Sequence, residues 1–277
     1  MRQTASNEES AEKADTGNKV QGSQTLLRGL DMLDQVLDGP IKLADLAARM
    51  GLTRSTTHRL ANALVDRGFL NFLPREGYLL GPKLLHLGFL AQSQADVVQI
   101  ARPRIEALAL ATDDTVHLGR RDGDLALYLD KIPGRRRVDI SSRVGDRQPL
   151  TSTGLGKALL LDEPEGNWNR LFTEDRVIGA PQADYTVWSE RMRDYVRSGH
   201  AFDLEENEDL IRCVAAPVRD ASGKIVAAIS VSSAAQYMDD DRMASLSQDV
   251  RGAARLISAD LGWNAETSPS PRPGKKG

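Results

Sequence analysis

The chain has 277 residues, of which 40% are hydrophobic and 27% are charged, and its formal net charge is −3. This is the composition of an ordinary globular protein of roughly two domains, and no apolar run reaches the length of a membrane span. Because the N-terminus has no apolar signal-peptide core, we expect a cytoplasmic protein. A single cysteine, Cys213, excludes an internal disulfide and fits a reducing compartment.

Both ends of the chain are poor in large apolar residues, so residues 1–22 and 265–277 are predicted to be disordered tails. A helix is predicted after the first tail, and it ends at Asp38, Gly39 and Pro40. Its buried face is predicted to consist of four leucines, namely Leu26, Leu30, Leu33 and Leu37.

Two short helices separated by a glycine follow. The stretch from Leu43 to Met50 repeats apolar residues at i, i+3, i+4 and i+7, which predicts a helix with one buried face. Gly51 can take the positive φ that ends a helix, and Thr53 or Ser55 can cap the next one. The short turn predicts a helix-turn-helix.

The second helix has a buried side and a polar side. Thr57, Leu60, Ala61 and Leu64 repeat the helical spacing and define its inner side. The opposite side and its flanks carry Arg54, Ser55, Thr56, His58, Arg59 and Asn62. Arginine can pair with guanine and asparagine with adenine, so these side chains are predicted to read double-stranded DNA. The alternative is that they form only the charged outer face of an amphipathic helix.

A strand pair completes this domain. Phe69 to Leu73 and Tyr78 to Leu80 are predicted strands, and the turn between them places Arg75 at the tip of a wing. Residues 23–82 are therefore predicted to form a winged helix-turn-helix domain. From Arg49 to Arg75 there are five arginines and one acidic residue, a cationic excess that favours phosphate contact.

A linker helix is predicted over residues 83–95, and a further helix from Val97 to Ala111. The linker is more apolar than a solvated helix needs to be. Packing against a second copy would explain this, because two-fold symmetric DNA readers bind paired half-sites. We therefore expect a homodimer or a homotetramer.

Residues 96–264 alternate predicted strands and helices, which indicates an α+β domain with an antiparallel sheet. The predicted strands are Thr115–Leu118, Leu125–Ile132 and Val138–Ser141, with a hairpin of Cys213–Val218 and Ile225–Val231. The predicted helices are Gly154–Leu161, Val187–Ser198 and Met238–Leu261.

The chain resembles the IclR family of bacterial transcription regulators from about Val20 to Gly262. The DNA-binding part is similar in Leu43-Ala-Asp-Leu-Ala47, in Gly51-Leu-Thr-Arg-Ser-Thr-Thr-His-Arg-Leu60 and in Gly68-Phe-Leu70. The second part is similar in Gly145-Asp-Arg-Gln-Pro-Leu150, Thr153-Gly-Leu-Gly-Lys-Ala158, Glu205-Glu-Asn207, Arg212-Cys-Val-Ala-Ala-Pro217 and Ala228-Ile-Ser-Val-Ser232. Each motif is weak alone, but their order is that of the family.

The resemblance implies a winged helix-turn-helix, a linker helix and a C-terminal GAF-like effector domain, assembled as a dimer or a dimer of dimers. It implies control of a catabolic operon by a small anionic metabolite, with repression favoured and activation as the alternative. The implied ligand-binding residues are Gly154, Leu155, Asp203, Cys213, Ser230 and Ser232. The family commonly has a glycine shortly before the Arg-Cys pair, whereas this chain has Asp209, Leu210 and Ile211.

The chemistry of these residues suits an anion, although two points stay open. Ser230 and Ser232 are two apart on a strand and share one face, where their hydroxyls would line a pocket or merely permit close packing. Lys157 would attract the anion or pair with a carboxylate. The segment from Tyr128 to Arg136 resembles family members that govern sugar-acid catabolism, which suggests a sugar acid or keto acid as effector. The run Arg135–Arg137 would otherwise be a solvated loop.

Enzymatic functions fit the sequence less well. The stretch Gly154–Lys157 lacks the phosphate-loop pattern, because Thr151 and Ala158 stand where glycine and a hydroxyl residue are required. A Cys213 nucleophile would need His117 or His200 as its base, and the four histidines have no metal-ligand spacing. We therefore predict no catalytic residue, metal or cofactor. A thiol enzyme is the alternative class, and a metabolite-sensing adaptor that does not bind DNA is a third.

Overall fold

The computed structural model describes residues 23–137, 140–177 and 184–265. The chain divides into two compact units, Met1–Gln94 and Ala95–Gly277. The predicted tails lie outside the described residues, apart from Ala265. Among the residues described, no helix is both long and apolar enough to cross a bilayer.

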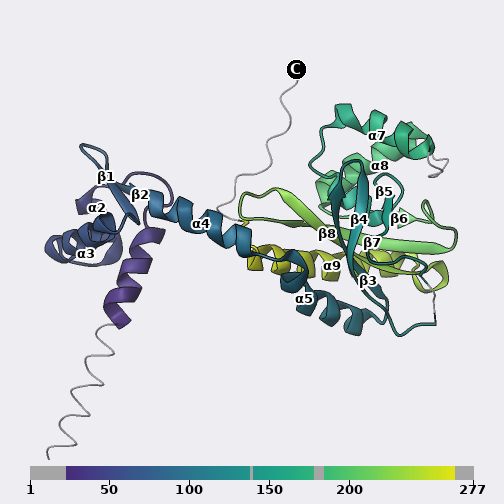
Figure 1. The fold of residues 1–277 in the computed structure, drawn as a ribbon, viewed down its shortest axis with the longest axis horizontal. Helices are drawn as coiled ribbons and strands as arrows, with labels where there is room; N and C mark the ends of the chain where they lie inside the picture. Colours follow the sequence, from purple (N-terminus) through teal and green to yellow (C-terminus); the bar gives the residue numbers. More distant parts are fainter. Residues whose placement is uncertain (1–22, 138–139, 178–183, 266–277) are drawn as a thin grey trace, which may run out of the picture. The chain divides into compact units, whose positions relative to one another are not determined.

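The first unit has the predicted winged helix-turn-helix fold (Figure 1). After a helix at residues 23–34, its elements are α2 (Leu43–Met50), α3 (Arg54–Asp66), β1 (Leu70–Leu73), β2 (Gly77–Leu80) and α4 (Pro82–Gln94). Its core contains buried side chains from the first three helices and the hairpin, among them Met32, Leu46, Ala61 and Leu70.

The turn between α2 and α3 forms as the sequence predicts. Gly51 takes the left-handed conformation, with φ of 62°, and its amide bonds to the Ala47 and Ala48 carbonyls at the end of α2. Thr53, and not Ser55, caps α3, because its hydroxyl accepts a hydrogen bond of 3.2 Å from the Thr56 amide.

The prediction for the first helix is wrong about its buried face. The fully buried side chains are Met32 and Val36, whereas Leu26, Leu30 and Leu37 are more than half exposed. Leu33 is only partly buried against the core. Leucines recur on two sides of this segment, and periodicity alone does not tell which side meets the core.

The wing is held against the chain that precedes α2. Ile41 and Tyr78 exchange backbone hydrogen bonds of 2.9 and 2.8 Å, which form an isolated antiparallel β-bridge beside the hairpin. Gly77 has φ of 115°, and a Cβ there would lie 2.1 Å from the Ile41 carbonyl oxygen. Only glycine allows this approach. Arg75 occupies the turn between the strands with φ of 77°.

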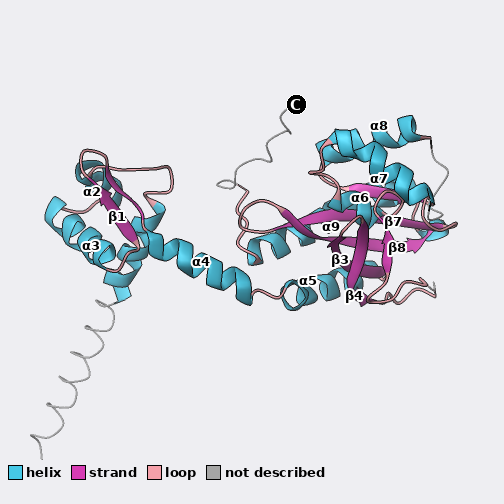
Figure 2. Ribbon diagram, turned by 45° about the horizontal axis from the view of Figure 1, so that its top comes forward, coloured by secondary structure: helices cyan, strands magenta, loops and turns pink. Residues whose placement is uncertain are grey.

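The second unit is built on a six-stranded antiparallel sheet of order β5-β4-β3-β8-β7-β6 (Figure 2). Its strands are β3 (Thr115–Asp122), β4 (Leu125–Ile132), β5 (Arg147–Pro149), β6 (Ala201–Leu204), β7 (Ile211–Arg219) and β8 (Ile225–Ala234). Its helices are α5 (Val97–Thr112), α6 (Gly154–Leu159), α7 (Glu165–Val177), α8 (Tyr185–Ser198), the short η1 (Ala235–Tyr237) and α9 (Asp240–Asp260).

Helices cover both faces of this sheet, so the domain has two cores. In Figure 1, α5 and α9 lie on one side of the sheet, and α7 and α8 lie on the other. Alternate residues of β7 point to opposite faces: Val214 and Ala216 pack with α5 and α9, whereas Ala215 packs with α6, α7 and α8. The predicted α+β arrangement is confirmed.

Several elements differ from the prediction in detail. Ile140 and Ser141 are not in a strand, and the other two residues of the predicted third strand lie outside the described residues. The sheet is extended instead by β5. The helix α7 and the strand β6 were not predicted, because each carries its apolar pattern for only a turn or a few residues. The last helix begins after Met238, since Asp239 caps it by accepting from the Arg242 amide at 2.8 Å.

Candidate DNA interface and effector pocket

The polar side of α3 faces solvent. Arg54, Ser55, His58, Arg59 and Asn62 are exposed. Thr56 is half-buried, and Thr57 and Ala61 on the opposite side are fully buried. Neither Arg54 nor Arg59, nor Arg75 in the wing, has a carboxylate partner among the described residues. These guanidinium groups are available to phosphates and bases.

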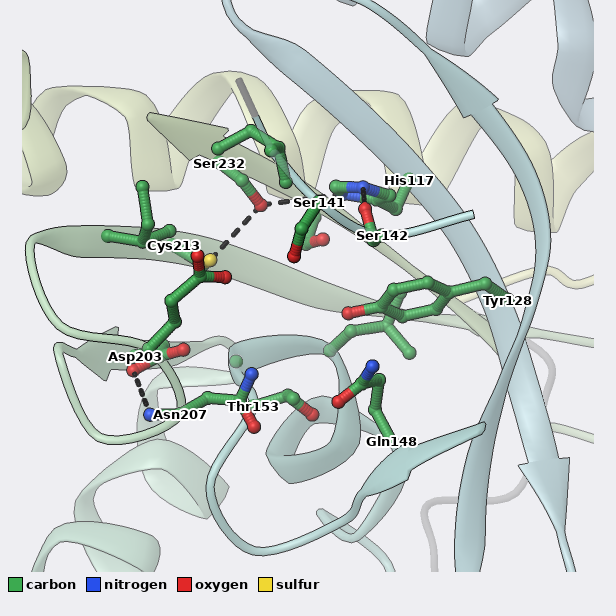
Figure 3. A pocket seen from close by; sticks show the side chains of 16 residues that line it. His117, Tyr128, Ser141, Ser142, Gln148, Thr153, Asp203, Asn207, Cys213 and Ser232 are labelled. Atoms are coloured by element: carbon green, nitrogen blue, oxygen red, sulfur yellow. Dashed lines mark hydrogen bonds between the residues drawn. The ribbon is translucent and has the colours of Figure 1, made fainter. Parts of the chain in front are cut away.

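The second unit contains a polar cavity of about 40 Å³ (Figure 3). It is lined by residues from the sheet, from the loop at residues 140–142, from the start of α6 and from the loop after β6. The structure brings together all six residues that the sequence predicted here, namely Gly154, Leu155, Asp203, Cys213, Ser230 and Ser232. Of these, Gly154 packs tightly, because a Cβ there would lie 3.2 Å from the Cys213 Cβ.

Strand register explains why residues far apart in the sequence meet. Cys213 pairs with Ser232 across β7 and β8, and also with Asp203 across β6 and β7. His117 pairs with Ser230 across β3 and β8. Directly paired residues point to the same face of a sheet, so this face of four adjacent strands forms one wall of the cavity.

A hydrogen-bond chain runs along that wall. The Cys213 thiol donates to the Ser232 hydroxyl at 3.0 Å, and this hydroxyl lies 3.4 Å from Nδ1 of His117. Nε2 of His117 lies 2.7 Å from the Ser142 hydroxyl, and the ring stacks on Tyr128 with centroids 4.9 Å apart. Figure 3 shows these side chains converging on the cavity. Burial, with a smaller effect of Lys131, lowers the pKa of His117 to about 3, so the imidazole is neutral.

The cysteine is not arranged as a nucleophile. Burial raises the pKa of the Cys213 thiol well above its ordinary value, and the Asp203 carboxylate raises it further. Its hydrogen bond goes to Ser232 and not to an imidazole. A reactive thiol needs the opposite conditions, namely a lowered pKa and an adjacent base.

Lys157 pairs with a carboxylate and does not line the cavity. Only 1% of it is exposed, and its ammonium group donates to the Phe202 carbonyl at 3.0 Å and to the Glu206 carboxylate. Glu206 also accepts from Arg191 at 3.1 Å. Burial lowers the pKa of Lys157 to about 8. Of the two roles left open by the sequence, the structure supports the ion pair.

Asp203 lines the cavity and bonds to the loop that carries Glu206. One of its carboxyl oxygens accepts from the Glu206 amide at 2.8 Å and from the Asn207 amide at 3.4 Å. Burial raises the pKa of Asp203 to about 7, and the attraction of Lys157 keeps it from rising further. The carboxyl group therefore changes charge near neutral pH.

Sequence reasoning missed several lining residues. They are His117, which was considered only as a base, together with Tyr128, Ile140, Ser141, Ser142, Gln148, Thr153, Asn207, Glu208 and Ile211. Ser141 and Ser142 belong to a loop held by Lys131, whose ammonium group donates to the Ile140 and Ser142 carbonyls at 2.6 and 2.7 Å. Neither the loop position nor this contact has a local sequence pattern.

The arginine run beyond β4 is more than a solvated loop. Arg136 is half-buried, and its guanidinium donates to the buried Asp114 carboxylate at 2.9 Å. It also lies over the Tyr237 ring, 4.9 Å from the centroid. Arg135 and Arg137 are exposed, as the solvated-loop interpretation predicts.

The departure from the family pattern has a structural counterpart at Leu210. This residue takes the left-handed conformation, with φ of 63°, just before β7. Glycine adopts that conformation without a steric cost, whereas other residues lose roughly 1–2 kcal/mol. The pairing of Asp203 with Cys213 is kept nevertheless.

We therefore expect Leu210→Gly to stabilise the second unit by about 1 kcal/mol. The leucine is 70% exposed, so little packing is lost. All three tryptophans lie in this unit, and their fluorescence during urea unfolding measures the change. Leu210→Ala, which keeps the strain, should not be stabilised. Equal effects of the two variants would show that the backbone strain is unimportant.

Within the described residues, no cluster of histidine, cysteine and carboxylate side chains has the geometry of a metal site. A winged helix-turn-helix in the same chain as a domain with a polar cavity defines a ligand-responsive DNA-binding regulator. The IclR helix-turn-helix domain matches residues 25–74, and the C-terminal domain of bacterial transcriptional regulator IclR matches residues 89–259. The chain belongs to the IclR family.

Known proteins agree with this assignment. The HTH-type transcriptional regulator XynR of Escherichia coli K12 is 31% identical over 250 residues, covering 89% of this chain and 99% of that protein. The DNA-binding transcriptional repressor YiaJ of the same organism is 29% identical over 266 residues, covering 91% and 93%. The crystal structure of Agobacterium tumefaciens repressor BlcR shares the fold, with a TM-score of 0.76 at 24% identity over 87% of this chain and 98% of that one. The chain is a transcription regulator and not an enzyme.

Proposed function

We propose that α3 reads an operator in the major groove of double-stranded DNA. The side chains assigned to this role are Arg54, Ser55, Thr56, His58, Arg59 and Asn62, with Arg75 of the wing on the adjacent backbone or minor groove. The supporting observation is that this side of α3 is exposed and its arginines have no carboxylate partner among the described residues. We assign DNA binding to residues 23–82, a linker to residues 83–95 and effector binding to residues 96–264.

We also propose that the chain acts as a homodimer or homotetramer. Large apolar side chains are exposed on the helix at residues 23–34 and on α4, among them Leu26, Leu27, Leu85 and Phe89. Exposed apolar groups of this kind mark association surfaces. A two-fold assembly presents two recognition helices to paired half-sites. Such a regulator works where the DNA is, so we place it in the cytoplasm.

The cavity of the second unit is assigned to a small polyhydroxylated or keto acid, with a sugar acid favoured. The observation that carries this assignment is Ser230, which is 2% exposed, lines the cavity and has no side-chain hydrogen bond to another described residue. Its hydroxyl faces the cavity without a partner from the described residues, so it can donate to or accept from a bound ligand. Gln148, Asn207 and Tyr128 offer further polar groups to the hydroxyls of a sugar acid.

The volume of the cavity bears differently on short keto acids and on longer sugar acids. Its 40 Å³ holds about three water-sized groups, enough for a carboxylate or a short keto acid. A longer sugar acid therefore requires the cavity to widen. The effector acts through its different affinities for two arrangements of the dimer, and we favour repression that the effector relieves. YiaJ and BlcR are named repressors. In a reporter assay, the effector should raise expression if the chain is a repressor, whereas an activator would show the opposite response.

Ser230→Ala is expected to weaken effector binding by about fivefold to tenfold, because one hydrogen bond to the ligand is lost. Isothermal titration of a panel of sugar acids and short keto acids measures the effect. The matched control is Ser233→Ala on the same strand, whose hydroxyl donates instead to the Asp114 carboxylate at 2.6 Å. Identical affinities of wild type and Ser230→Ala would remove Ser230 from the ligand site.

Binding of an anionic effector should weaken as the pH rises through the pKa of Asp203, which burial raises to about 7. Below that pH the carboxyl group is protonated and can donate to the ligand, whereas above it the carboxylate repels an anion. The affinity should fall about tenfold between about pH 6 and about pH 8. Asp203→Asn should bind with little pH dependence. A steep profile in this variant as well would assign the titration to another group.

A further inference from the structure

A second cavity of about 140 Å³ lies where α9 packs against β7. Its lining comes from α9, from β7, from Gly199 at the start of the turn before β6 and from Trp263 after α9. It shares no lining residue with the cavity assigned to the effector. The two sites are therefore separate.

Three arginines line this cavity, and two of them have no ion pair with a described residue. Arg219 is neutralised by the Asp162 carboxylate at 2.6 and 2.9 Å. Arg251 and Arg255 have no acidic partner among the described residues, and no carboxylate lines the cavity. The two lie one helical turn apart on α9, where like charges repel each other. An anion bound between them would relieve that repulsion.

The other lining residues are mostly apolar. They are Ala216 and Pro217 of β7, Ala254 of α9 and the half-buried Trp263, together with Gly199 and Ser258. Because a water-sized group needs roughly 10–15 Å³ of such space, the cavity holds about ten of them. This is room for one aromatic ring with a carboxyl group.

We propose that this cavity is a second small-molecule site, which binds a compact aromatic carboxylate between the indole of Trp263 and the guanidinium groups of Arg251 and Arg255. Guanidinium groups bind carboxylates through paired, charge-assisted hydrogen bonds, and aromatic rings pack on indole and proline surfaces. Both features are present here. The guanidinium groups would bind the carboxylate of the ligand, and the indole and proline surfaces would pack against its ring. The site does not depend on the assignment of the effector pocket.

The test uses the full chain and para-fluorobenzoate as the probe, with binding followed by fluorine NMR line broadening. Arg251→Gln and Arg255→Gln should each weaken binding about tenfold, and Trp263→Leu by a few fold. The matched control is Arg120→Gln, since Arg120 is an exposed arginine of the same unit without an ion pair to a described residue. Circular dichroism confirms that each variant is folded.

The outcomes are distinct. Loss of binding in the two α9 variants, with normal binding in Arg120→Gln and Ser230→Ala, supports the site. Loss only in Ser230→Ala would show that the probe occupies the effector pocket, and would overturn the proposal. No binding to the wild type would do the same. A changed sedimentation coefficient of Arg251→Gln without any probe binding would show that a second copy of the chain covers this surface instead.

Discussion

Replacing Arg59 with alanine is expected to reduce specific operator binding by about a hundredfold or more. A bidentate contact from arginine to guanine favours the correct base over a wrong one by roughly 1–3 kcal/mol of binding free energy. In a dimer, the substitution removes one such contact from each half-site. Arg59 is exposed on α3 and has no carboxylate partner among the described residues, so its removal should cost little stability. Fluorescence anisotropy of a labelled operator measures the loss.

The matched control is Arg67→Ala. Arg67 is also exposed, but it caps the C-terminal end of α3, away from the N-terminal turns that recognition helices place in the groove. Its loss should change affinity only a few fold and equally for specific and non-specific DNA. Steep weakening with salt should persist in both variants, because most phosphate contacts remain. If Arg59→Ala bound the operator as tightly as the wild type, α3 would not read the operator through this residue.

The helix-turn-helix could be predicted from the sequence because its determinants are local. Gly51 ends one helix, Thr53 caps the next, and the apolar spacing in each helix is unambiguous. The first helix was predicted correctly as a helix, but its buried face was not. Leu26 and Leu30 have the same spacing as core residues yet are exposed, because a pattern does not distinguish a face that meets the core from one left for a partner.

The pocket was predictable only in part. Five of the six predicted residues lie in motifs that carry the family resemblance, Asp203 lies two residues before such a motif, and the structure brings all six together. His117 and Tyr128 reach the same cavity through strand register, and Ser142 does so through a loop held by Lys131. These contacts join segments far apart in the sequence, so no local sequence pattern predicts them.

Lys157 illustrates the same limit for charge. Its partner Glu206 is 49 residues away, and the sequence alone does not single out this carboxylate among the others. The ion pair holds the loop after β6, because Glu206 also donates its amide to Asp203, and the next residue, Asn207, lines the cavity. We infer that Lys157 positions the pocket without contacting the effector.

Lys157→Met is therefore expected to destabilise the second unit by about 3–5 kcal/mol, because it leaves a buried carboxylate with a lost partner. The Glu206 side chain is 9% exposed, and Arg191 alone remains to compensate its charge. The double variant Lys157→Met with Glu206→Gln should recover part of the loss, since no unpaired charge is then buried. Arg170→Met is the matched control. The ion pair of Arg170 with Asp124 is about half exposed and should contribute no more than roughly 1 kcal/mol to the free energy of unfolding. Tryptophan fluorescence during urea unfolding measures the free energy of unfolding of the wild type and of these three variants. A double variant less stable than Lys157→Met would contradict the role of Glu206 as the group that Lys157 neutralises.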